Sequence, residues 1–227
     1  MSSKKKYPLF VVSLVWQIVL VENNKRVNRH IITERLGQSK NMNSIPNIKL
    51  IDDRLEGKVS LPIWKDFQNR QVAYGSLDES ENLNGEFGIS IGGDMVVDNP
   101  TIKMEHTNAY DYLATHSEQV QNSILTRLLA EYKNLQTEYG YQEDKAKEFM
   151  PVVDKIEQFK KLIGLSQIHI MEVSKDNISY VGYEFSCTWD DEHGIGFMTH
   201  KQRIIDFGGA DTSFLTWVAK KDLKSNE

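Results

Sequence analysis

The residues with the greatest chemical potential form one short segment toward the end of the chain. It reads Trp189-Asp190-Asp191-Glu192-His193-Gly194-Ile195-Gly196. Three consecutive carboxylates beside an imidazole could hold a divalent metal ion through oxygen and nitrogen ligands. The same groups could supply a carboxylate–histidine pair for acid–base catalysis. The segment has no His-Glu-x-x-His spacing, no Cys-x-x-Cys pair and no calcium-loop pattern, so its motif does not select a reaction.

We interpret this segment as a turn between two strands. A second loop is expected to lie beside it. If strands over 195–199 and 203–207 pair through a tight turn at 200–202, residue 195 lies opposite residue 207. The loop over 208–211 then lies next to the first loop. The candidate binding residues at this end of the sheet are Asp190, Asp191, Glu192, His193 and Asp211. The expected ligands of any metal are Asp190, Glu192, His193 and Asp211.

Three interpretations of this loop end stay open. The first is a structural turn in which acidic groups accept hydrogen bonds from backbone amides and His193 donates a fixed hydrogen bond. The second is a binding surface, and the third is a metal or catalytic site. The residues expected to shape the two loops are Trp189, Gly194, Gly196, Gly208 and Gly209. We expect no bound cofactor.

The single cysteine, Cys187, lies close to His193 in the sequence but is not expected to act as a nucleophile. It belongs to an alternating run with Tyr183, Phe185 and Trp189, whose side chains face the same way in a strand. A cysteine buried among aromatic rings is usually inert. One cysteine allows no internal disulfide and favours a reducing compartment, so we expect a cytoplasmic protein.

The elements that must position these loops are strands and helices in separate runs. Helical spacing of Val120, Ile124 and Leu128 predicts a helix over 116–139, with a capping box at 115–118 and a stop at Gly140. Such an order of strands, then helices, then strands predicts an α+β domain whose antiparallel sheet carries helices packed on one face. Further helices are predicted at 142–149 and 151–163, and strands at about 59–63, 87–91, 166–173, 178–189, 195–199 and 203–207.

The length and the charge of the chain limit its domain organisation and the kinds of partner that it can bind. The 227 residues predict one α+β domain over 47–220, preceded by a basic and apolar extension with a linker over 1–46. The net charge is −5, distributed as +7 over residues 1–50 and −12 over the rest. An acidic body disfavours nucleic acid as a partner of the main domain and favours a basic protein.

The apolar run within residues 4–21 raises the alternative of membrane contact. Its 15 apolar-rich residues would extend about 22 Å as a helix, short of the ~30 Å hydrocarbon core of a bilayer. Contact with the membrane surface therefore stays an alternative that we do not favour.

The segments over 180–196 and 204–212 resemble an uncharacterised bacterial domain family. The family's mark is a Trp-Asp-x-Glu-His-Gly-x-Gly turn followed by a Gly-x-Ala-Asp loop, and residues 61–64 and 117–119 also fit. The similarity covers about residues 47–217 and does not include the extension. Members are similar to the intracellular immunity proteins that accompany bacterial toxin systems. The resemblance thus implies a bacterial protein that binds a partner, and no established activity.

We therefore expect a non-enzymatic protein-binding module of the immunity type, in which the acidic loop end contacts a basic protein. A metal-assisted hydrolase that uses the same carboxylate and histidine residues is the first alternative. A membrane-surface protein anchored by residues 4–21 is the second.

Overall fold

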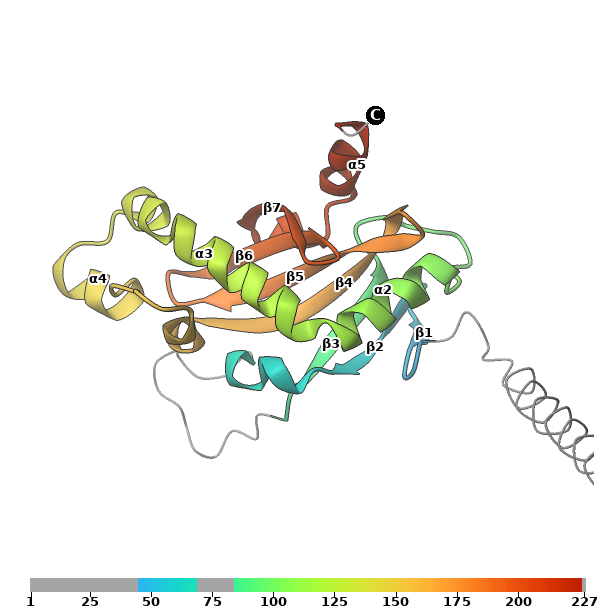
Figure 1. Ribbon diagram of the computed structural model, residues 1–227, viewed down its shortest axis with the longest axis horizontal. Coiled ribbons are helices and arrows are strands. Elements are labelled where there is room, and N and C mark those ends of the chain that lie inside the picture. The colour runs from blue at the N-terminus through green and yellow to red at the C-terminus, as the bar shows by residue number, and fades with distance from the viewer. Residues whose placement is uncertain (1–44, 69–83, 226–227) are drawn as a thin grey trace, which may run out of the picture. The chain divides into compact units, whose positions relative to one another are not determined.

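A computed structural model describes residues 45–68 and 84–225, which build a seven-stranded sheet with helices (Figure 1). The predicted extension over 1–46, with its apolar run, lies almost entirely outside the described residues, and the domain boundary stays a prediction. Within the described ranges, no helix combines the length and apolar character needed to cross a membrane. The elements in chain order are β1 (Lys49–Ile51), β2 (Arg54–Ser60), η1 (Pro62–Phe67), β3 (Glu86–Gly92), α2 (Met104–Thr115), α3 (Ser117–Tyr139), α4 (Glu143–Phe149), η2 (Ile156–Lys161), β4 (Ile163–Lys175), β5 (Ile178–Cys187), β6 (Asp190–His200), β7 (Arg203–Gly209), η3 (Ala210–Ser213) and α5 (Thr216–Lys224).

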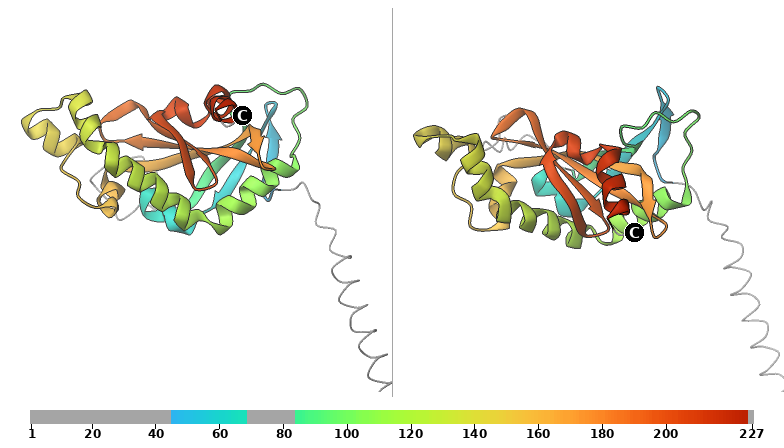
Figure 2. Two further views of the ribbon diagram at one scale, coloured as in Figure 1. Left: turned by 45° about the horizontal axis from the view of Figure 1, so that its top comes forward. Right: turned by 90° about the horizontal axis from the view of Figure 1, so that it is seen from above.

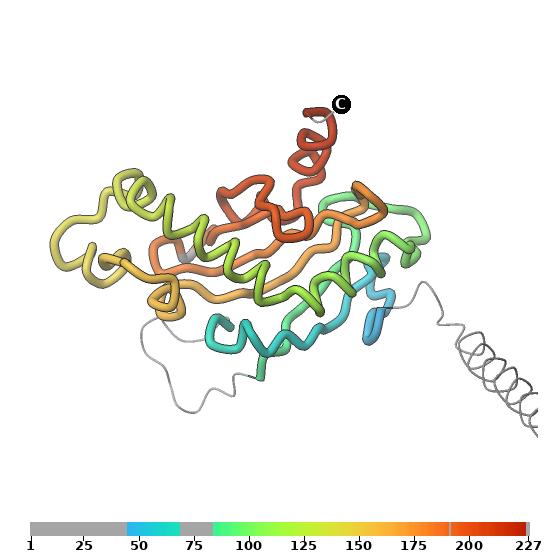
Figure 3. Tube along the Cα trace, viewed as in Figure 1, coloured from blue at the N-terminus to red at the C-terminus, as the bar shows by residue number. Residues whose placement is uncertain are grey.

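The sheet follows the order of the chain, from β1 at one edge to β7 at the other. Neighbouring strands are antiparallel except β3 and β4, which run parallel with Ser90 opposite His169. A parallel pair needs a long crossover, and here it contains α2, α3, α4 and η2 (Figure 3). The α+β class is confirmed and the sheet is mostly antiparallel. The prediction of a fully antiparallel sheet is wrong at this one pair.

One face of the sheet packs against α2 and α3. Alternate residues of the central strands, among them Ile168, Tyr183 and Phe197, are buried there. The stripe of α3 that includes Ile124 and Leu128 covers them, as helical spacing predicts. Burial of this apolar area is the main favourable term in the folding of the domain.

The opposite face carries a second, smaller core. Met171, Tyr180 and Met198 belong to the same central strands but face the other way, and they pack with Val218 and Ala219 of α5. Helices therefore lie on both faces (Figure 2). The prediction of helices on one face is wrong for α5, because β4, β5 and β6 carry apolar residues in both alternating positions and so need cover on both sides.

The helix boundaries are partly as predicted. Helix α3 ends at Tyr139, and Gly140 follows in the left-handed region with φ of 63°. Helix α4 confirms the short helix predicted at 142–149. The capping box at 115–118 is wrong, because α2 ends at Thr115, whose hydroxyl donates to the Asp111 carbonyl within that helix.

The helix predicted over 151–163 is replaced by the short 3-10 turn η2. The side-chain oxygen of Gln158 accepts hydrogen bonds from the backbone N–H groups of Asp154 and Lys155, at 2.8 and 2.9 Å. Those contacts hold Lys155 in an extended conformation, so helical structure begins only at Ile156. Strand β4 begins at Ile163 and leaves no room for a longer helix.

Helix α5 is fastened to the sheet by a charged pair. Arg203 donates to both carboxylate oxygens of Asp222 at 2.9 and 2.6 Å, and the Tyr180 hydroxyl donates to the same carboxylate at 2.8 Å. The Asp222 side chain is 11% exposed, whereas that of Arg203 is 49% exposed. The hydrogen bonds from Arg203, together with that from Tyr180, outweigh burial and hold the pKa of the Asp222 carboxyl well below its usual range.

We expect Asp222→Asn to lower the free energy of unfolding by about 1–2 kcal/mol at neutral pH, because charge-assisted hydrogen bonds are lost beside a half-exposed arginine. The folded-state pKa lies below the unfolded value of about 3.9, so this contribution is complete above about pH 5 and is lost as the pH falls toward the folded-state pKa. Urea denaturation of the wild type and of Asp222→Asn, at pH 7 and near pH 3, measures the free energy of unfolding and its dependence on pH. Asp144→Asn, on an exposed residue paired with Lys147, is the control. A stability difference that does not narrow in acid would contradict this account.

Candidate functional site

The predicted loop end lies at the connection between β5 and β6. The hairpin turn is formed by Thr188 and Trp189, since Cys187 pairs with Asp190. The next pair is Phe185 with Ile195, so residues 191–194 are extra residues opposite Ser186. The prediction of a turn at 190–194 is therefore wrong: this segment is a long bulge within β6. A bulge re-aims side chains at the edge of a pairing, which is how these residues come to project from the sheet.

Gly194 makes this bulge possible. Its φ is 67°, in the region that side-chain-bearing residues rarely adopt. A Cβ at this position would overlap the carbonyl oxygen of Phe185 and lie 3.3 Å from the carbonyl carbon. Gly194 therefore has the shaping role that the sequence predicts, through close approach of two backbone segments as well as through its dihedral angle.

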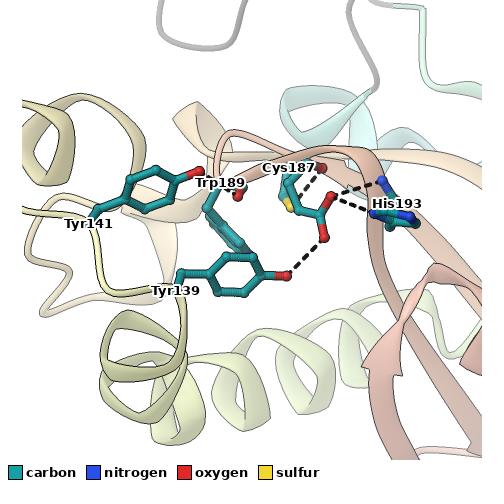
Figure 4. Close-up of polar contacts among 6 residues, drawn as sticks. Tyr139, Tyr141, Cys187, Trp189 and His193 are labelled. Atoms are coloured by element: carbon teal, nitrogen blue, oxygen red, sulfur yellow. Dashed lines mark hydrogen bonds and ion pairs between the residues drawn. The ribbon is translucent and has the colours of Figure 1, made fainter.

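The Asp190 carboxylate is the organising group of the bulge (Figure 4). One oxygen accepts from the His193 backbone N–H at 2.9 Å and from the His193 ring Nδ1 at 3.2 Å. The other accepts from the Tyr139 hydroxyl at 3.0 Å. Burial opposes ionisation, but these hydrogen bonds prevail and lower the pKa of the Asp190 carboxyl.

These bonds decide what Asp190 and His193 can do. An ionised carboxylate only accepts, so Nδ1 of His193 carries the proton that it donates to Asp190. The other ring nitrogen, Nε2, takes no part in this hydrogen bond, and the His193 side chain as a whole is 75% exposed. Asp190, with an 18% exposed side chain, already accepts three hydrogen bonds, which engage both of its carboxylate oxygens.

Three aromatic residues anchor the bulge to the body of the domain. Trp189 is buried and packs edge-on against Tyr132 at 5.6 Å between ring centroids. The Trp189 carbonyl accepts from the Tyr141 hydroxyl at 3.0 Å, and the Tyr141 ring stacks with that of Tyr139 at 6.4 Å. Cys187 is buried beneath this cluster and donates weakly to the Asp190 carbonyl, as its predicted inward position implies.

Not all of the other predicted site residues contact the Asp190 cluster. Glu192 is exposed, while the side chain of Asp191 lies outside the described part of the structure. Asp211 is exposed in η3, and its side chain forms no hydrogen bond or ion pair with the described atoms of Asp190, Glu192 or His193. Among the described residues, no group of three His, Cys, Asp or Glu side chains could hold a metal ion.

The strand register explains the position of Asp211. Ile195 pairs with Gly209 instead of residue 207, because the turn is formed by 201–202 and an irregularity follows Met198. Gly196 pairs with Gly208, and a Cβ at Gly196 would lie 2.6 Å from the Ala210 carbonyl oxygen. The glycines of the two loops thus allow η3 to fold back over the sheet and carry Asp211 with it.

Sequence reasoning missed the tyrosines of this site. Tyr139 continues the helical spacing of the apolar residues of α3, which favours a packing role, yet it is 37% exposed and its hydroxyl donates to Asp190. Tyr141 follows the Gly140 stop that the sequence does predict. The sequence Tyr-Gly-Tyr across the end of the helix is the signal that could have been used, because a reversal at the glycine turns both rings toward the same strand end.

A second constellation was missed entirely. Ser90, His169 and Glu184 lie on three neighbouring strands and form a continuous hydrogen-bonded chain. His169 had no cysteine or histidine neighbour in the sequence that would single it out. The parallel register of β3 and β4 brings it beside Ser90.

The bulge geometry predicts that Gly194→Ala destabilises the fold by about 2–4 kcal/mol, through both the dihedral penalty and the overlap with the Phe185 carbonyl. Gly140→Ala is a matched control, because Gly140 has a φ of 63° but no neighbour nearer than 4.0 Å to the added Cβ. We expect about 1–2 kcal/mol for that control. Equilibrium denaturation measures the free energy of unfolding that each variant loses. Equal losses for Gly194→Ala and Gly140→Ala would contradict the close approach of the Phe185 carbonyl to Gly194.

The comparisons with known proteins give the family and nothing more specific. No curated protein and no solved structure matches the chain. Residues 56–215 match the family described as Domain of unknown function (DUF6985). The match begins inside β2 and ends after η3, so it includes both the bulge and the chain formed by Ser90, His169 and Glu184. It covers well over half of the chain, and the protein therefore belongs to the DUF6985 family.

Proposed function

We propose that this chain is a cytoplasmic protein-binding module of the bacterial immunity type, whose loop end acts by contact and not by catalysis. We define the loop-end surface as Tyr139, Tyr141, Asp190, Glu192 and His193. Its partner is a basic protein. The observation that carries the proposal is the set of three hydrogen bonds that Asp190 accepts from Tyr139 and His193, which holds an exposed acidic bulge in one conformation.

Preorganisation favours binding, because a side chain that is already ordered loses little entropy when a partner docks. The Asp190 bonds fix the backbone at His193, and the Trp189 anchor fixes the preceding turn. Glu192 and His193 then project from a rigid base. Tyrosine is enriched among the residues that contribute most to protein interfaces, and Tyr139 supplies a partly exposed ring beside the acid groups.

Charge supports a basic partner. The chain beyond residue 50 carries a net charge of −12, and Glu192 stands in solvent at the loop-end surface. Such a field accelerates encounter with a cationic protein and does so most strongly at low salt. Asp211 is exposed as well, but its side chain forms no hydrogen bond with the described atoms of this cluster, and we leave it outside the loop-end surface.

The two alternatives receive less support. A metal-assisted hydrolase needs several free ligands, whereas Asp190 already accepts three hydrogen bonds. Attachment to a membrane surface would depend on residues 4–21, which lie outside the described residues. Neither alternative is supported by a described contact, so we do not propose them.

The proposal predicts that Glu192→Lys weakens partner capture about tenfold or more at low salt, because it replaces an attractive charge in the contact by a repulsive one. The full chain serves as bait, and each recovered protein is quantified at low and high salt. Glu118→Lys, on an exposed residue at the far end of α3, is the control for net charge.

A partner of the loop-end surface is recovered by the wild type and by Glu118→Lys, is lost with Glu192→Lys, and is released by salt. Equal recovery by both variants, or recovery that salt does not change, would remove the loop end from the interface. Both variants are compared with the wild type by circular dichroism so that a loss of fold is not read as a loss of contact.

A further inference from the structure

A chain of polar side chains crosses the face of the sheet that α5 and η3 partly cover. Ser90 on β3 lies 2.8 Å from Nδ1 of His169 on β4, measured from its hydroxyl oxygen. Nε2 of His169 lies 2.9 Å from a carboxylate oxygen of Glu184 on β5. The His169 side chain is only 12% exposed, and that of Glu184 is 31% exposed. These residues are separate from the loop-end surface.

The direction of the hydrogen bonds follows from the donor inventory of the three groups. An ionised Glu184 carboxylate only accepts, so the neutral His169 ring carries its proton on Nε2. Nδ1 then holds a lone pair and accepts the proton of the Ser90 hydroxyl. Because the serine hydroxyl donates in this contact, its oxygen keeps its lone pairs. This is the arrangement of a nucleophile, a general base and an orienting carboxylate.

The histidine ring is held in this position from several sides. Ser90 and His169 are direct partners in the parallel register, and His169 is opposite Gly182 in β5. Because Gly182 has no side chain, the Ser213 carbonyl of η3 lies directly over it. Phe214, the next residue, packs its ring edge against His169 at 5.5 Å between centroids. A base with so little rotational freedom is suited to proton transfer.

The serine end of the chain opens to a shallow pocket. Ser90 lines it together with the charged residues Asp53, Arg54 and Glu172 and the apolar side chains of Met95, Val97 and Pro100. Arg54 is exposed and forms no ion pair with a described residue, so its guanidinium is available to a developing negative charge. The pocket is small and its walls mix charged and apolar groups, so it admits a short acyl group and excludes a long chain or a peptide.

We propose that Ser90 is a nucleophile activated by His169 and Glu184, and that this site accepts a small carboxylic ester. The Ser90 oxygen attacks the ester carbonyl carbon as its proton passes to Nδ1 of His169. The C–O bond to the leaving group then breaks, and the proton moves from Nδ1 to the departing alkoxide to give the alcohol. Water attacks the acyl-serine, transfers a proton through the same nitrogen to Ser90, and releases the carboxylic acid. This activity goes beyond partner binding at the loop end.

The test is acylation of the purified full chain by p-nitrophenyl acetate. We expect release of nitrophenol with an acetyl adduct on Ser90, located by peptide mass spectrometry, and covalent labelling of the same residue by a fluorophosphonate. Ser90→Ala removes both. His169→Asn lowers the acylation rate about 100-fold by removing the base. Glu184→Gln lowers it by at least about tenfold, because the charge that stabilises the imidazolium is lost.

Ser166→Ala is the matched control. Ser166 is also a partly buried serine of this sheet, but its hydroxyl donates to the backbone carbonyl of Glu184 and contacts no histidine. Circular dichroism and melting curves establish which variants are folded, and Glu184→Gln decides the test if His169→Asn does not fold. Absence of an adduct on Ser90, or a rate that folded His169→Asn and Glu184→Gln variants leave unchanged, would overturn the proposal.

Discussion

The burial of β4, β5 and β6 on both faces is the constraint on which the rest of the structure depends. Each strand supplies alternate residues to two cores, so a polar residue at its centre must find a partner within the sheet or beneath its cover. The Thr199 hydroxyl donates to the Val181 carbonyl, and His200 contacts the Lys175 carbonyl. The same requirement joins His169 to its two neighbours. Glycine at 182 and 196 lets η3 approach where a side chain would keep it away.

The predictable part of the fold is the part set by local periodicity. Helix α3, strands β4, β5 and β7 and the second half of β6 follow from apolar spacing that tertiary contacts only reinforce, and the end of α3 follows from Gly140. The parallel pairing of β3 with β4 does not, because it depends on where a long helical crossover returns the chain. The position of helix α5 on the second face was not predicted. That face needs a covering helix only because the central strands carry apolar residues in both of their alternating positions.

The candidate site shows the same division. Asp and Gly at 190–194 were interpreted as turn residues, which they often are, but the hairpin closes at Thr188–Trp189 because the buried Trp189 ring anchors that turn against Tyr132. The hydrogen bonds from His193 to Asp190 are local, and they fit the interpretation of a structural turn in which acidic groups accept from backbone amides and His193 donates a fixed hydrogen bond. Contacts with Tyr139, or between Ser90 and His169, join residues 51 and 79 positions apart and need the whole fold.

Two carboxylate–histidine pairs in one sheet now differ in what they can do, and the difference lies in where each chain of hydrogen bonds ends. At the loop end, Nδ1 of His193 donates its proton to Asp190, so this ring nitrogen cannot accept a proton from a hydroxyl. At the sheet face, His169 accepts from Ser90, whose oxygen borders a pocket. The first arrangement stabilises one conformation of an exposed surface, and the second leaves a serine oxygen at the end of its chain of hydrogen bonds. Binding and bond-making chemistry would therefore reside at separate places in the fold.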